Sequence, residues 1–221
     1  MPYTQVEKDD GVAVVWLDQP GEKVNKLARS LVDEFNTLLD KLEQDSEVKG
    51  VVLISKKKDT FIAGADLEQL LELTQPGQVE ELSQKGHRVL NRIADFPKPI
   101  VAAVHGAALG GGLEVALACH YRIISDAPQS LLGLPEVKLG LLPAGGGTQR
   151  LPRLVELQRA LDIMLSGKNV YPHQAKKMGL VDLMIHPYGL LDAAKKSALD
   201  LLSNPMKRKK KAPLYLKAIE E

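Results

Sequence analysis

One stretch decides the fold: PKPIVAAVHGAALGGGLEV, residues 97–115. Pro97 and Pro99 interrupt any preceding helix, because proline lacks the amide hydrogen that helix interiors and central strands require. Residues 100–104 form an unbroken apolar run, which is typical of a strand buried on both faces. A glycine run at residues 110–112 then opens a segment with helical patterning that carries Glu114. A buried strand that leads directly into a helix predicts an α/β fold.

The same alternation extends in both directions from this stretch. Toward the N-terminus, two short strands flank Asp9-Asp10-Gly11, and Asp-Gly between strands is a strong hairpin signal. Ser30 is expected to cap a helix that runs to about Asp45, because apolar residues recur there at helical spacing. We therefore expect parallel sheets covered by helices. The expected strands are residues 5–8, 12–17, 51–54, 100–104 and 121–124, and the expected helices are 30–45, 67 onward, 80–95, the glycine run to about 120, 155–165, 172–178 and 190–202.

Size and composition favour one domain with a good-sized core. The chain has 221 residues, 44% of them apolar, and its 29 basic side chains nearly balance 28 acidic ones. This balance gives no general attraction to nucleic acid or to an anionic membrane, and the run Lys207–Lys211 is expected to be a solvated linker or helix end. Cys119 is the single cysteine, so we expect no intrachain disulfide and a reducing, cytoplasmic location. No signal-peptide pattern is visible, and no apolar stretch reaches the ~20 residues of a membrane-spanning helix.

The glycine-rich loops do not match the known nucleotide-binding motifs. A P-loop needs Lys and then Ser or Thr after its last glycine, and neither glycine run provides them. The dinucleotide pattern also fails, because Val115 and Arg150 stand where its third glycine is required. Free amides at a helix start favour a developing negative charge, so Gly110–Gly112 is a candidate oxyanion hole, and Ala63–Asp66 is a second turn of this kind. The alternatives are that the glycines only permit close strand–helix packing and that Asp66 only caps a helix.

Two glutamates are candidates for acid–base chemistry. Glu114 follows the glycine run, Glu136 follows Pro135, and both are flanked by apolar residues. Two carboxyl groups in a low-dielectric cleft could divide acid and base roles between them. The alternative for Glu114 is a surface residue stabilised by the helix dipole. The histidines are scattered singly, which favours core or surface roles over metal ligation; they are His87, His105, His120, His173 and His186.

Three segments of the chain together resemble the crotonase superfamily. Residues 61–67 resemble the first oxyanion-hole segment of that family, residues 97–114 resemble the second with its catalytic Glu, and residues 134–151 resemble the segment that carries the second Glu. They occur in family order, and the resemblance covers about residues 5–185. Leu113–Ala116 and Lys177–Asp182 are most similar to the N-terminal hydratase part of the multifunctional fatty-acid β-oxidation α-subunit. One departure is Pro143–Thr148, where this chain has Ala144 and Gly145 in the reverse of the family order.

The resemblance implies a fold and a set of residue roles. The fold would be a spiral of repeated β-β-α units over residues 1–185, with a helical C-terminal segment at 186–221 that is truncated or leads to a missing domain. The amides of Ala65 and Gly111 would hold the thioester oxygen of an enoyl-coenzyme A. Glu114 would activate the attacking water and Glu136 would protonate C2. Substrate-binding roles are implied for Val24, Ala63, Asp66, Leu67, Gly110 and Pro135.

The activity implied by the resemblance is hydration of trans-2-enoyl-CoA to 3-hydroxyacyl-CoA in fatty-acid β-oxidation. No metal or redox cofactor is implied, because coenzyme A is part of the substrate. Two alternatives stay open: a Δ3,Δ2-enoyl-CoA isomerase, and a non-catalytic acyl-CoA-binding fragment. Both glutamates are present, which favours the hydratase, whereas the short C-terminus favours the fragment. The implied partners are further copies of the chain in a trimer, or a hydroxyacyl-CoA dehydrogenase domain and a thiolase; no nucleic acid or integral membrane segment is expected.

Overall fold

A six-stranded sheet forms the centre of the molecule. The computed structural model describes residues 2–205, so the basic run at 207–211 lies outside the described residues. β1 (Thr4–Asp9) and β2 (Val12–Leu17) form the predicted antiparallel hairpin. The sheet order is β1-β2-β3-β5-β7-β9, and every pairing after the first is parallel. Its remaining strands are β3 (Gly50–Ser55), β5 (Ile100–Val104), β7 (Tyr121–Ser125) and β9 (Leu183–Ile185).

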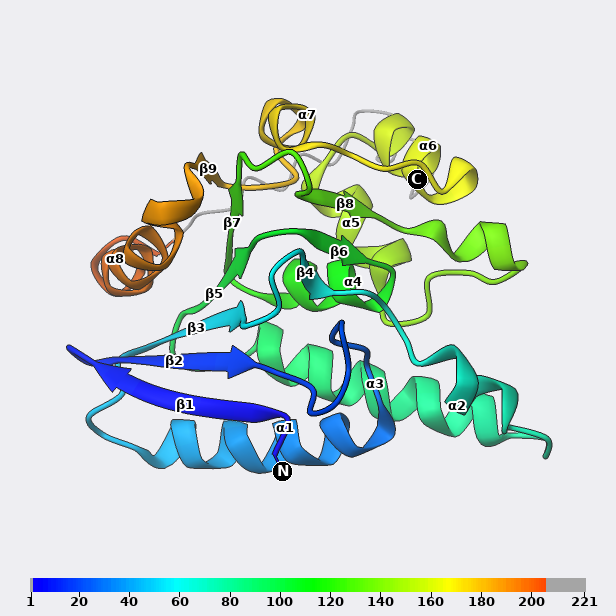
Figure 1. Ribbon diagram of the computed structural model, residues 1–221, viewed down its shortest axis with the longest axis horizontal. Helices are drawn as coiled ribbons and strands as arrows, with labels where there is room; N and C mark the ends of the chain where they lie inside the picture. The colour runs from blue at the N-terminus through cyan, green and yellow to red at the C-terminus, as the bar shows by residue number, and fades with distance from the viewer. Residues whose placement is uncertain (1, 206–221) are drawn as a thin grey trace, which may run out of the picture.

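A second, smaller sheet lies beside the first and positions the candidate site. It consists of β4 (Thr60–Ile62), β6 (Ala107–Leu109) and β8 (Leu131–Gly133), and its strands pair in parallel in that order. The chain repeatedly enters the large sheet, crosses to the small sheet and then forms a helix. This β-β-α order recurs three times, in β3-β4-α2/α3, β5-β6-α4 and β7-β8-α5 (Figure 1).

Helices cover both faces of the large sheet, which explains its unbroken apolar strands. α1 (Arg29–Gln44), α3 (Gln78–Ala94) and α4 (Gly111–Ala118) share one core with alternate strand residues such as Val15, Leu53 and Ala102. The intervening residues, such as Val14 and Val52, face α8 (Leu190–Ser203), which stands apart from α1 and α3 in Figure 1. A strand buried on both sides has no polar face, so its sequence cannot alternate.

Several element boundaries differ from those expected. Ser30 does not cap α1, because the N-cap position is Ala28 and no side chain caps the helix there. Asp66 does cap its helix, α2 (Leu67–Leu71), by accepting hydrogen bonds from the amides of Glu68 and Gln69. A helix that was not expected, α5 (Gly147–Leu154), tolerates Pro152 near its end. The other elements are α6 (Leu157–Ser166), which starts after the predicted residue 155, α7 (Pro172–Met178), and the 3-10 turns η1 (Pro135–Leu139) and η2 (Pro187–Gly189).

Within the described residues, none of the helices combines the length and the apolar character needed to cross a membrane.

Candidate active site

The small sheet brings the three predicted site segments to one edge. Residues 63–66 follow β4, Gly110 and Gly111 follow β6, and Pro135-Glu136 follow β8. Because the three strands are parallel, their carboxyl ends meet at the same edge, which is where ligands bind in many parallel sheets. Gly110 shows how close the segments lie. A methyl carbon on it would lie 3.8 Å from Gly64 Cα and 3.1 Å from Glu136 Oε1.

The amides of Ala65 and Gly111 are both available at this edge. Gly111 is the first residue of α4, so its amide has no partner within the helix. Among the hydrogen bonds of residues 2–205, none uses the amide of Ala65 as a donor. The flanking backbone is fixed, since Leu27 donates to Gly64 O at 2.8 Å and Gly110 donates to Gly133 O at 2.9 Å. Gly64 and Gly110 have positive φ values of 115° and 53°, which glycine adopts without strain. Two unpaired donors on adjacent turns therefore suit a single oxygen acceptor.

A cavity of about 560 Å³ opens in front of these amides. Its wall is mainly apolar and comes from α1, α2, α3 and the loop after η1. All the predicted site residues except Val24 line it: Ala63, Ala65, Asp66, Leu67, Gly110, Gly111, Glu114, Pro135 and Glu136. Val24 is half-buried elsewhere, because its neighbour Asn25 is drawn into the interior, where its side chain bonds to Ser55 Oγ and to the carbonyls of Leu17 and Phe61.

Glu114 is a buried carboxylate held by backbone amides. Its side chain projects from the first turn of α4, and the residue is 3% exposed. Oε1 accepts hydrogen bonds from Gly145 N at 2.8 Å and Gly147 N at 2.7 Å. Burial raises the pKa of Glu114, while these two hydrogen bonds and the charges of Arg150 and His87 oppose that rise. Since both bonds go to Oε1, Oε2 is left for another partner.

Glu136 faces the same cavity but is only half-buried. Among the described residues its Oε2 is buried without a hydrogen-bond partner. Burial, together with the nearby charge of Glu114, raises the pKa of Glu136 to about 7, and a backbone hydrogen bond only partly offsets this. Two carboxyl groups with different environments thus share one cavity, an arrangement that can assign one as acid and the other as base near neutral pH.

The residues that hold Glu114 were not identified from the sequence. In the sequence, Gly145 and Gly147 stand out only as glycines of an incomplete nucleotide motif, and Arg150 only as the residue that breaks that motif. His87 was assigned a core or surface role, yet its Nε2 contacts Ala144 O in the loop beside Glu114. His105 does not line the cavity; its Nε2 lies 2.6 Å from Lys57 O. The sequence could not show that these residues lie near Glu114 in space, because they are about thirty residues or more from it along the chain.

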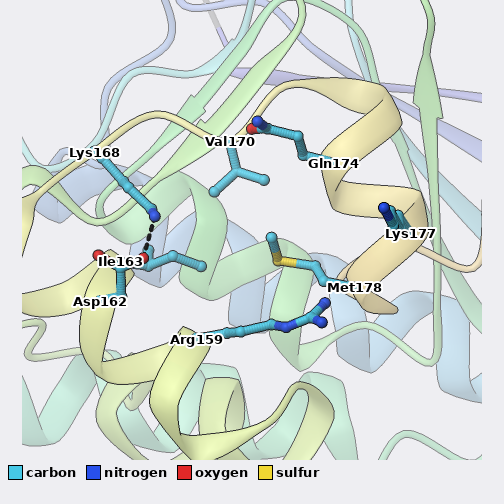
Figure 2. A pocket seen from close by; sticks show the side chains of 8 residues that line it. All are labelled: Arg159, Asp162, Ile163, Lys168, Val170, Gln174, Lys177 and Met178. Carbon is cyan, nitrogen blue, oxygen red and sulfur yellow. Dashed lines mark hydrogen bonds and ion pairs between the residues drawn. The ribbon is translucent and has the colours of Figure 1, made fainter.

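A second pocket, of about 290 Å³, lies between α6 and α7 and contains none of the predicted site residues (Figure 2). Arg159, Lys168 and Lys177 line it, and Lys168 is paired with Asp162. Its side chains are largely exposed and carry no unpaired buried group. Over residues 2–205, no cluster of His, Cys, Asp and Glu has the geometry of a metal site.

Comparisons with known proteins agree on one family. The sequence profile of the enoyl-CoA hydratase/isomerase family matches residues 7–216. A fatty acid oxidation complex subunit alpha from Shewanella amazonensis is 48% identical over 218 residues, which is 99% of this chain and 31% of the relative. The same subunit from Shewanella baltica (strain OS185) is 50% identical over 197 residues, 89% of this chain and 28% of the relative. This chain therefore spans about a third of the length of these relatives.

Solved structures support the same relationship. An enoyl-CoA hydratase from Geobacillus kaustophilus superposes with a TM-score of 0.84 at 34% identity, covering 91% of this chain and 75% of that one. An enoyl-CoA hydratase from Bacillus anthracis superposes with a TM-score of 0.84 at 30% identity, covering 92% of this chain and 78% of that one.

Proposed function

This chain belongs to the enoyl-CoA hydratase/isomerase family, and on that premise we propose that it adds water across the double bond of trans-2-enoyl-CoA thioesters to give 3-hydroxyacyl-CoA. One observation carries the proposal. The amides of Ala65 and Gly111 and the carboxyl groups of Glu114 and Glu136 all face a single cavity. Neither a binding module nor a scaffold requires two unpaired amides opposite two carboxyl groups with raised pKa values.

The proposed reaction uses each of these groups once. The amides of Ala65 and Gly111 donate hydrogen bonds to the thioester oxygen, on which negative charge grows as water adds to C3. Glu114 takes a proton from the attacking water through the oxygen that its amide partners leave free. Glu136 supplies a proton to C2, and its pKa of about 7 keeps part of it protonated near neutral pH. The product gains one hydroxyl at C3 and one hydrogen at C2. The proton taken up by Glu114 must then return to Glu136, directly or through solvent, which restores both groups for the next turnover, and no electrons are exchanged.

The cavity wall suits an acyl-CoA. Its buried end is lined by apolar side chains such as Leu31, Phe35 and Ile93, which can accept a hydrocarbon tail. Arg29 and Lys138 add positive charge to the lining, where the phosphates of coenzyme A could pair with them. Coenzyme A is part of the substrate in this proposal, and no metal or redox cofactor takes part.

The raised pKa and unpaired oxygen of Glu136 also favour a second candidate function. A single carboxyl group beside an oxyanion hole can carry a proton between two carbons, which is Δ3,Δ2-enoyl-CoA isomerisation. Hydration and isomerisation could therefore share this cavity, and an assay must measure them separately.

The test is a hydration assay on crotonyl-CoA that follows the loss of enoyl absorbance, run with trans-3-hexenoyl-CoA to detect isomerisation. We expect Glu114→Gln and Glu136→Gln each to lower turnover by roughly two to four orders of magnitude while binding of butyryl-CoA is largely kept. Glu7→Gln, on the exposed strand β1, is the matched control and should retain full activity. If the unaltered protein bound butyryl-CoA but transformed neither enoyl substrate, the non-catalytic alternative would replace this proposal.

The wider setting of the reaction is also proposed by analogy with the relatives. The matched relatives are named as subunits of a fatty acid oxidation complex and are about three times as long as this chain. We place the reaction in fatty-acid β-oxidation in the cytoplasm, next to a hydroxyacyl-CoA dehydrogenase domain and a thiolase, or in a trimer of this chain. Mass measurement in solution distinguishes the trimer from the monomer.

A further inference from the structure

The loop at residues 143–147 controls Glu114, because its amides at Gly145 and Gly147 hold Oε1. A loop can orient a side chain only if the loop itself is fixed. Two of its amides, those of Gly145 and Gly147, are used on Glu114, and its carbonyl groups make the contacts that can fix it. Two successive carbonyls of this loop, those of Ala144 and Gly145, are bonded to side chains from outside it.

Arg150 binds one of these carbonyls and connects the loop to α3. Its Nη1 donates to Gly145 O at 2.9 Å, and its Nη2 donates to Asn91 Oδ1 at 2.7 Å. The guanidinium also covers Gly146, where φ is 100° and a methyl group would collide with Nη1. The planar fork of arginine suits such a bridge, because it presents two donors in fixed directions.

α3 holds the other carbonyl directly. Ser83 Oγ donates to Ala144 O at 3.3 Å, and His87 Nε2 contacts the same oxygen. The same helix supplies Val89, Leu90 and other residues to the cavity wall. The loop that orients Glu114 is therefore anchored on the helix that would contact the substrate.

The guanidinium of Arg150 bonds to neutral oxygen atoms and not to a carboxylate. The side chain is half-buried, and no salt bridge to it is recorded within residues 2–205. Its guanidinium instead bonds to one carbonyl and one amide oxygen, and its positive charge lowers the pKa of Glu114. The charged groups that act on Glu114 are Arg150 from α5, His87 from α3 and, across the cavity, Glu136 from η1.

From this geometry we infer that Arg150 is a positioning residue for the reaction. Its guanidinium bridge between Asn91 and Gly145 holds the two amides that orient Glu114, and its charge favours the carboxylate that activates water. The inference rests on the proposed hydratase function, because it assigns Arg150 a part in that site.

The experiment compares Arg150→Ala, Arg150→Lys and Arg153→Ala in crotonyl-CoA hydration. Arg153 is the matched control, since it lies on the same helix and bonds only to Gln149 among the described residues. We expect Arg150→Ala to lower kcat by roughly a hundredfold with little change in KM, because misplacing a catalytic group affects the transition state more than binding. Arg150→Lys keeps the charge but not the bridge, so it should recover only part of the rate. Added guanidinium ion should partly restore Arg150→Ala and have no effect on Glu114→Gln.

A readout that does not depend on turnover separates this inference from the proposed function. Carboxyl ¹³C NMR of the glutamates, with the Glu114 signal assigned from Glu114→Gln, should show Glu114 titrating at higher pH in Arg150→Ala than in the unaltered protein. If the unaltered protein fails to hydrate crotonyl-CoA, the proposed function fails, and this titration still tests the contact. The inference is overturned if Arg150→Ala loses no more activity than Arg153→Ala, or if the Glu114 titration does not move. A folded Arg150→Lys variant with normal activity and an unmoved pH profile would also overturn it.

Discussion

Gly147 N donates a 2.7 Å hydrogen bond to Glu114 Oε1, across 33 positions of sequence. This contact joins the first turn of α5 to the first turn of α4, so both helix starts contribute to one carboxylate. Gly145 donates a second bond to the same oxygen. Glycine is required at both positions for space, because a side chain there would point into the carboxylate.

Gly145→Ala should lower both hydration activity and stability. The added methyl carbon would lie 2.5 Å from Glu114 Oε2 and 3.0 Å from Leu90 Cδ1, so the carboxylate must turn away from its present orientation. We expect kcat for crotonyl-CoA to fall by roughly tenfold to a hundredfold, and the free energy of unfolding to fall by about 1–3 kcal/mol. Gly189→Ala, in η2 and away from the cavity, is the control for a simple methyl addition. Unchanged kcat in Gly145→Ala would show that Glu114 needs no fixed orientation.

Glu136 should make stability depend on pH in an identifiable window. Its pKa in the folded protein is about 7 against an ordinary value of 4.5, so the folded state holds this proton more tightly than the unfolded chain does. The contribution of the group to stability is full below pH 4.5 and is lost as the pH rises through about 7. Glu136→Gln removes this titration and should stabilise the protein by about 1–2 kcal/mol at about pH 8, after allowance for partial solvent exposure, with little effect at about pH 4.

Thermal denaturation of Glu136→Gln and the unaltered protein across this pH range measures the effect. Glu7→Gln serves as the exposed control. A stability difference between Glu136→Gln and the unaltered protein that stays constant with pH would mean that Glu136 titrates alike in the folded and unfolded states.

Sequence reasoning succeeded where a local pattern determines the structure. Ile100–Val104 was predicted with its observed boundaries, because a short apolar run rich in β-branched residues, with Pro99 before it and Gly106 soon after, favours a strand with both faces covered. The strands β4, β6, β8 and β9 were not among the expected strands. Each has only three residues, and Ala107–Leu109 is a strand because its neighbours in the small sheet pair with it, not because of its own propensity. The family and the crotonase-like fold, predicted from the resemblance, are confirmed by the comparisons.

The candidate site was predictable only in part, for a related reason. Glu114 and Glu136 were found from their apolar surroundings, whereas Gly145 and Gly147 act through backbone amides, which every residue has. Ser30 was expected at the N-cap because serine favours that position, but the N-cap lies two residues earlier, at Ala28. The catalytic roles assigned to the two glutamates stay predictions until activity is measured.

Two glycines on helices should respond oppositely to alanine. A methyl carbon on Gly112 would lie 2.8 Å from Ile62 Cβ and closer still to the Ile62 carbonyl, because α4 packs directly on β4 there. Gly86, within α3, has no heavy atom within 4 Å of such a carbon. We expect Gly112→Ala to lower the free energy of unfolding by about 3 kcal/mol or more, and Gly86→Ala to raise it by about 0.5–1 kcal/mol through helix propensity. Chemical denaturation of both variants measures this, and a Gly112→Ala variant of normal stability would contradict the close α4–β4 contact.

The buried end of the cavity should determine acyl-chain preference. Val89 lies on α3, is almost fully buried and lines the cavity. Val89→Phe should shorten the space for a hydrocarbon tail, and each methylene that is no longer buried costs about 0.8 kcal/mol. We therefore expect kcat/KM for trans-2-decenoyl-CoA to fall by at least tenfold relative to that for crotonyl-CoA, whose short tail does not reach this end.

Val155→Phe is the matched control, because Val155 is similarly buried but does not line the cavity, so it should change stability without changing the ratio. An equal loss on both substrates in Val89→Phe would place the acyl tail elsewhere, and steady-state kinetics with the two substrates decides between these outcomes.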